Sequence, residues 1–147
     1  MRQVRDFIGF TGIVLSLVFV GWEIRDNTKV AKGQTRAELT ALNNEYLRRI
    51  AGDSELSEIW QRAWKAEEQL TESEEFRARL ILMQFIRLLE NVHLQYQEGL
   101  IDEKALDSYG FLGFREQYMD HPIFREIWAP RIGTYDPLFV EYIEVLR

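Results

Sequence analysis

Apolar and polar positions follow a helical period along most of the chain, but the first segment is apolar throughout. Residues 7–22 read FIGFTGIVLSLVFVGW and contain no charged side chain. As a helix this segment is roughly 24 Å long, slightly less than the ~30 Å hydrocarbon core of a bilayer. Arg2, Arg5 and Trp22 flank it and can extend to the headgroup level. The pattern therefore predicts a transmembrane helix.

Two other interpretations of this segment are weaker. A cleavable signal peptide ends in small residues, whereas this segment ends VFVGWEIRD, with bulky side chains at almost every position. A buried helix of a soluble protein usually carries a polar stripe, and this segment has none. We therefore expect an uncleaved transmembrane anchor over residues 1–25 and an α-helical soluble domain over residues 26–147.

Cations near the two ends of the segment predict its orientation. Arg2, Arg5 and the α-amino group precede it, and four cations follow it closely. Because cytoplasmic flanks carry the excess of Lys and Arg, the larger C-terminal part is expected in the cytoplasm, by a margin of one charge. The four cations that follow are Arg25, Lys29, Lys32 and Arg36.

Small residues within the segment predict a possible packing face. Gly9, Gly12 and Ser16 recur at spacings of three and four, so they share one side of a helix. Small side chains allow close approach of two helices in lipid, where no hydrophobic driving force brings them together. Glycine is also common in membrane helices generally, so pairing through this face and a neutral role both remain open.

The remainder of the chain predicts further helices. Apolar residues recur every three or four positions, and no segment alternates long enough to form a strand. One long helix is expected from the membrane segment to Gly52, although residues 26–28 (Asp-Asn-Thr) could equally cap a new helix. Shorter helices are expected to begin near Asp53, Asp102, His121 and Asp136, and the one at His121 is expected to end near Trp128. Gly99 is expected to end the helix that precedes Asp102. One apolar face of the long helix consists of Leu39, Leu42, Tyr46 and Ile50.

The segment from Thr71 to about Gln97 predicts the central helix of a bundle. Thr71 and Glu74 form a capping box, in which each side chain accepts a hydrogen bond from a backbone N–H at the start of the helix. The rest of the segment is apolar on more than half of its circumference, so other helices must surround it. The predicted fold class is all-α, with one N-terminal transmembrane helix followed by a small helical bundle.

Composition excludes several classes of function. The 147 residues suffice for one domain, and the net charge of −6 disfavours nucleic acid as a partner, because phosphate binding requires clustered positive charge. The chain has no cysteine, which removes thiol nucleophiles, disulfides and cysteine-based metal centres. No nucleophile motif or phosphate-binding glycine loop occurs, so we expect no catalytic residue and no cofactor.

One pair of residues has the spacing of metal ligands. Glu90 and His93 lie three apart, as in the carboxylate-bridged di-iron bundles. Such a centre needs a second Glu-x-x-His motif. His121 does not complete one, because neither of the residues three and four positions before it is a carboxylate. We therefore expect no metal, although a two-fold dimer could supply the missing half.

A polar patch interrupts the apolar central helix. Arg87 with Glu90 or Asn91 can form a hydrogen-bonded network there, since unpaired buried charge would be costly. We interpret the patch as fixing the register of neighbouring helices, and the alternative is contact with a polar ligand or partner. Its members are Gln84, Arg87, Glu90, Asn91 and His93.

Three tryptophans lie on short predicted helices. Trp60, Trp64 and Trp128 are expected to pack in the core. Any of them that is exposed would instead be an anchor for a protein partner, because aromatic side chains dominate interface energetics.

Several segments together resemble a family of bacterial single-span, membrane-anchored α-helical proteins of unknown function. These segments are EIRDNT at residues 23–28, EIW at 58–60 and RLLENVHLQYQEGLID at 87–102, in addition to the anchor. The resemblance implies a bacterial inner-membrane location and carries over no catalytic residue.

The expected function is that of a membrane-anchored accessory or scaffold protein and not an enzyme. Its expected partners are membrane lipid, which would surround the anchor, and either another protein or further copies of this chain. The alternative is a membrane-tethered metal-binding enzyme or ligand sensor that uses the polar face of the central helix.

Overall fold

The structure is a computed structural model that describes residues 2–65, 69–111, 113–114 and 118–146, with side chains described from residue 13 to 145 within these ranges. It is 86% helical, and the described residues contain no strand, which confirms the all-α prediction. The helices form a bundle. They are α1 (Arg2–Ala51), α2 (Ser54–Lys65), α3 (Glu72–Gln97), α4 (Glu103–Ser108), α6 (Pro122–Arg131), the 3-10 helix η1 (Ile132–Thr134) and α7 (Pro137–Leu146).

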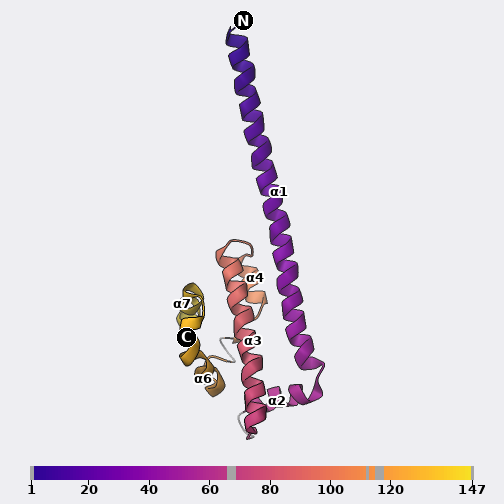
Figure 1. The fold of residues 1–147 in the computed structure, drawn as a ribbon, viewed down its shortest axis with the longest axis vertical. Coiled ribbons are helices and arrows are strands. Elements are labelled where there is room, and N and C mark those ends of the chain that lie inside the picture. Colours follow the sequence, from indigo (N-terminus) through magenta and orange to yellow (C-terminus); the bar gives the residue numbers. More distant parts are fainter. Residues whose placement is uncertain (1, 66–68, 112, 115–117, 147) are drawn as a thin grey trace.

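Helix α1 is one continuous rod of 50 residues, roughly 75 Å long. The hydroxyl of Thr28 donates a hydrogen bond of 2.8 Å to the Ile24 carbonyl within the helix, so residues 26–28 do not start a new one. The rod ends where the Gly52 N–H donates to the Arg48 carbonyl. The N-terminal half of α1 stands clear of every other helix, and its C-terminal part lies beside α3 (Figure 1).

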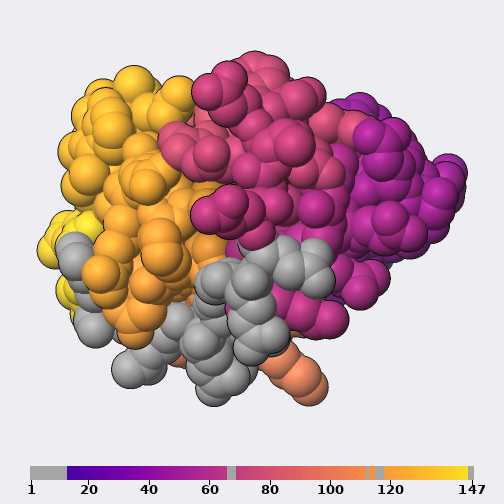
Figure 2. Space-filling model, turned by 90° about the horizontal axis from the view of Figure 1, so that it is seen from below, coloured from indigo at the N-terminus to yellow at the C-terminus, as the bar shows by residue number. Residues whose placement is uncertain are grey.

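Helix α3 is the centre of the bundle, as its apolar circumference predicts. It packs against α1, α2, α4, α6 and α7. Viewed from the end opposite the N-terminus, α1 and the C-terminal helices lie on opposite sides of it (Figure 2). Leu82, Ile86, Leu89 and Val92 are fully buried along its length. Each such side chain stabilises the fold by roughly 1.5–3 kcal/mol relative to exposure.

The capping box at the start of α3 is present. The Thr71 hydroxyl accepts a hydrogen bond from the Glu74 N–H, and the Glu74 carboxylate accepts one of 2.8 Å from the Thr71 N–H. Arg62 of α2 also pairs with Glu74. The Thr71 N–H and the Arg62 guanidinium lower the pKa of Glu74 to about 2.

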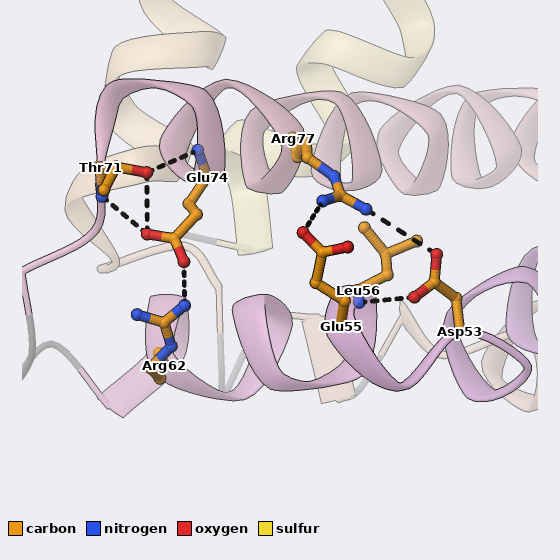
Figure 3. A network of polar contacts seen from close by, with 7 residues as sticks. All are labelled: Asp53, Glu55, Leu56, Arg62, Thr71, Glu74 and Arg77. Carbon is orange, nitrogen blue, oxygen red and sulfur yellow. Dashed lines mark hydrogen bonds and ion pairs between the residues drawn. The ribbon is translucent and has the colours of Figure 1, made fainter.

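Polar contacts fasten α2 to α3 beyond this cap (Figure 3). Arg77 of α3 lies 2.5 Å from a Glu55 carboxylate oxygen and 3.8 Å from one of Asp53. Asp53 also accepts a hydrogen bond of 3.0 Å from the Leu56 N–H and so caps α2. The two ion-pair clusters fix both ends of α2 against one face of α3.

The caps predicted in the C-terminal half are present, but α6 is longer than expected. Gly99 ends α3 with a φ of 71°, and Asp102 caps α4 by accepting from the Ala105 N–H. His121 caps α6 through Nδ1, which accepts from the Ile123 N–H. The sequence predicts an end near Trp128, whereas the helix continues through Pro130 to Arg131. A proline so close to the end of a helix removes one backbone hydrogen bond and leaves the preceding turns intact.

Replacing Thr71 by Ala is expected to lower the free energy of unfolding by about 1 kcal/mol, because the Glu74 N–H loses its acceptor. Urea unfolding followed by circular dichroism measures this change. Ser73→Ala, at an exposed position in the same turn, is the matched control and should change stability by less than ~0.5 kcal/mol. Equal effects of the two substitutions would show that the capping box does not stabilise α3.

Candidate functional site

The projecting part of α1 carries a continuous set of exposed apolar side chains, which we call the apolar collar. All residues from 13 to 20 are exposed, and eight successive positions of a helix point in every direction around its axis. The exposed fractions of the apolar members range from 41% to 72%. The collar consists of Ile13, Val14, Leu15, Leu17, Val18, Phe19, Val20, Trp22 and Ile24.

The collar is the described part of the predicted membrane segment. Among the side chains that the structure describes, no helix has a stretch that is both long and apolar enough to cross a bilayer. Residues 7–12 of the predicted segment lie outside those side chains. Gly9 and Gly12 of the predicted packing face are therefore not described, and Ser16, the third member, is exposed.

Four cations follow the collar along one side of α1. Arg25, Lys29, Lys32 and Arg36 are separated by four, three and four residues, which places them on a single face of the helix. All four are exposed. Arg36 forms an ion pair of 2.9 Å with Asp102, the N-cap of α4, and this pair fastens the rod to the top of the bundle.

Two members of the predicted polar patch, Arg87 and Glu90, form an ion pair of 2.6 Å on α3. Arg87 also donates to the carbonyl and the hydroxyl of Thr134, both at 3.1 Å, and its guanidinium lies 4.2 Å from the centre of the Tyr135 ring. The other carboxylate oxygen of Glu90 accepts a hydrogen bond of 2.7 Å from the Asp136 N–H. Glu90 exposes 12% of its side chain and Arg87 exposes 49%.

These contacts join α3 to the connection between η1 and α7. The Asp136 N–H lies at the start of α7, so the charge of Glu90 is also favourably placed at a helix N-terminus. Arg87 and Glu90 thus bond to each other and to Thr134 and Asp136. The geometry is that of a brace that sets the position of α7 against α3.

His93 lies elsewhere, in an aromatic part of the core. It is fully buried, and its ring is 4.8 Å from that of Tyr142 and 5.8 Å from that of Phe139. Its Nε2 lies 3.3 Å from the Gln97 amide nitrogen, and its Nδ1 has no hydrogen-bond partner among the described residues. Burial lowers the pKa of His93, so the neutral ring is favoured.

The structure does not gather metal ligands around Glu90 and His93. Both carboxylate oxygens of Glu90 are engaged by Arg87 and Asp136. Within the described parts of the chain, no group of three or more acidic, histidine or cysteine side chains is placed to hold a metal ion.

Gln84 and Asn91, the remaining members of the patch, line an open groove between α1 and α3. The groove has a volume of about 610 Å³, and Arg87 reaches its edge. Its two walls are some forty residues apart in the chain, so no local sequence pattern predicts the groove. One signal was present in the sequence: Leu42 and Tyr46 lie on the predicted apolar face of α1, and both line this groove.

The three tryptophans have different surroundings. Trp128 is 5% exposed, stacks on Phe124 and Tyr135, and donates its Nε1–H to Glu144 at 2.8 Å, so it belongs to the core. Trp60 and Trp64 are half-buried on α2 and contact each other edge to face at 4.8 Å. Of the three predicted anchors, these two remain partly accessible to a partner.

No protein-family model matches this chain, and neither the curated proteins nor the solved structures include one similar to it.

Replacing Glu90 by Ala is expected to lower the free energy of unfolding by about 1–3 kcal/mol, because the Asp136 N–H and the Arg87 guanidinium lose their acceptor. Glu141→Ala, at an exposed position of α7, is the matched control and should change it by less than ~0.5 kcal/mol. Chemical denaturation of both variants gives the comparison. If the two lose the same stability, the brace contributes nothing.

Acid is expected to destabilise the bundle between about pH 7 and pH 5. Burial lowers the pKa of His93 and of His121 below the ordinary value of 6.5, so the unfolded chain binds more protons in this range and stability falls as the pH falls. The pKa of Glu74 is about 2 in the folded protein and ordinarily 4.5. The stability that this carboxylate contributes is therefore lost at lower pH than that of the histidines.

Denaturation of His93→Gln across this pH range is the measurement, because glutamine does not titrate and can still bond to Gln97. The variant should show a smaller decrease in unfolding free energy from pH 7 to pH 5 than the parent protein. If the unfolding free energy of the variant decreased with pH as steeply as that of the parent, His93 would not be a source of the acid sensitivity.

Proposed function

We propose that this protein is a membrane-anchored helical accessory or scaffold protein that acts through protein contacts, either with its own copies or as a subunit of a larger membrane complex. The observation that carries the proposal is the apolar collar at the projecting end of a rigid helix. Exposed apolar surface on this scale is unfavourable in water and requires a cover.

The distribution of the collar favours lipid as that cover. A partner helix would bury one stripe of α1 and leave the opposite side exposed. Residues 13 to 20 are apolar in nearly every direction around the axis, with Ser16 the exception. Acyl chains surround a helix on all sides, so they match this distribution, and Trp22 at the end of the collar suits the interface.

The cations after the collar support the same arrangement. Lys and Arg are enriched on the cytoplasmic side of membrane helices, and anionic headgroups attract such residues. We place the C-terminal bundle in the cytoplasm and the anchor in a bacterial inner membrane. The resemblance to bacterial single-span helical proteins agrees with this placement.

The rest of α1 would act as a spacer. Leu39 is the first fully buried side chain among those described in α1, about 25 Å along the helix from Trp22. A continuous helix, fixed to α4 by the Arg36–Asp102 pair, holds the bundle at a set distance and orientation. That geometry suits a scaffold, which presents a folded surface at a defined height above the membrane. Trp60 and Trp64 are partly exposed aromatic residues of that surface.

The untagged full chain is expected to remain with bacterial membranes after an alkaline carbonate wash. Val14→Arg combined with Val18→Arg should move most of it to the supernatant, because each charge in the hydrocarbon costs about 2.5–3.5 kcal/mol. Val30→Arg combined with Leu47→Arg is the matched control. It adds the same charge at exposed apolar positions of α1 outside the collar and should leave the protein in the pellet.

Recovery of the parent protein in the supernatant would contradict the anchor. Native mass measurement of the detergent-extracted particle then tests the scaffold role separately. A particle heavier than the 17.5 kDa chain is expected, and a monomer without a partner would contradict that role while leaving the anchor intact.

A further inference from the structure

The groove between α1 and α3 has the features of a ligand site. Its volume of about 610 Å³ is within the range of small-molecule pockets. The two helices run antiparallel along it (Figure 1), and its α3 wall from Arg77 to Asn91 is about 20 Å long. Apolar side chains dominate the lining: Leu42, Leu56, Leu80, Ile81, Met83 and Leu88.

The bundle leaves this apolar lining partly uncovered. Leu42 and Leu80, from opposite walls, are 45% and 44% exposed, although α1 buries Leu39 and α3 buries Leu82 and Leu89. Tyr46 stacks on Phe85 at 5.5 Å and closes the groove toward the core. The elongated, apolar lining fits a single hydrocarbon chain better than a compact polar molecule.

Three arginines and one carboxylate, Glu45, line the groove, and the arginines differ in how firmly they are held. Arg77 and Arg87 are engaged by carboxylates at 2.5 Å and 2.6 Å. Arg49 lies 3.7 Å from Glu45, and both side chains are more than half exposed. Arg49 is therefore the cation that can turn to an incoming anion at little cost. It lies at the α2 end of the groove, where α1 ends and α3 begins.

We propose that the groove binds a free single-chain amphiphile with an anionic carboxylate or phosphate head, the hydrocarbon chain lying between Leu42 and Leu80 and the head at Arg49. The guanidinium supplies two parallel donors that match either head group. The site lies in the bundle, so it does not depend on the membrane anchor.

Protection of a thiol in the groove tests this proposal. The natural chain has no cysteine, so Leu80→Cys introduces a unique thiol in the lining. The full-length variant, in nanodiscs of zwitterionic phospholipid, is alkylated with a water-soluble maleimide in the presence of decyl phosphate or decanoate. Saturating amounts of either should slow alkylation at least about fivefold, because the occupied groove excludes the reagent.

Phe76→Cys is the control for general effects of the amphiphile. Phe76 is 62% exposed on the same helix, one turn earlier and outside the lining, and its thiol should react at an unchanged rate. Arg49→Ala in the Leu80→Cys background should weaken the protection about tenfold in concentration, the equivalent of 1.4 kcal/mol. The adjacent exposed Arg48→Ala should not.

Three results would overturn the proposal. They are no protection by either anion, equal protection by the cation decyltrimethylammonium, and protection that is insensitive to Arg49→Ala. A fourth concerns the source of the ligand: if nanodiscs with anionic phospholipid protect the thiol before any amphiphile is added, the occupant is a bilayer lipid and not a free single-chain molecule.

Discussion

Covering the apolar surface of α1 is the constraint on which the structure depends. The helix is roughly 75 Å long, and the bundle packs against its C-terminal part. Side chains change from buried at Leu39 to exposed at every position from Ile13 to Val30. No rearrangement of the short helices could cover a collar that faces all directions, because they are attached at the far end of the rod. In the proposed arrangement, lipid supplies this cover from outside the bundle.

Within the bundle, α3 packs against short helices that would not be stable alone. Helices such as α4, with six residues, are far below the length at which an isolated helix forms in water. Each is held by a cap and by burial against α3. Apolar burial alone does not fix how these helices are oriented. The Arg87–Glu90 brace does so for α7, because it bonds to the turn between η1 and α7.

Features that depend on neighbouring residues were predictable from the sequence. The capping box at Thr71 and the stop at Gly99 are determined by side chains and backbone within a few positions. The end of α6 was not predictable in this way, because Pro130 usually marks a boundary, and here it is tolerated in the last turn. The patch on α3 was predicted as one unit, but it divides among the brace, the core at His93 and the groove.

Long-range packing accounts for the rest. Sequence reasoning could not tell which tryptophan is buried, since Trp64 and Trp128 lie in similar amphipathic segments. Their difference depends on contacts of Trp128 with Tyr135 and Glu144, which are brought together by the turn after α6. The groove likewise requires the spacing of α1 and α3, which the apolar pattern of either helix alone does not determine.

The environment around each position of the collar is the most direct measurement of the central claim. Because the chain has no cysteine, spin labels can be placed singly at residues 13 to 20 of the full protein in lipid nanodiscs. Lipid on all sides predicts that every label is accessible to oxygen and shielded from a water-soluble nickel reagent. Accessibility that rises and falls with the helical period, or nickel contact throughout, would contradict a lipid-embedded collar.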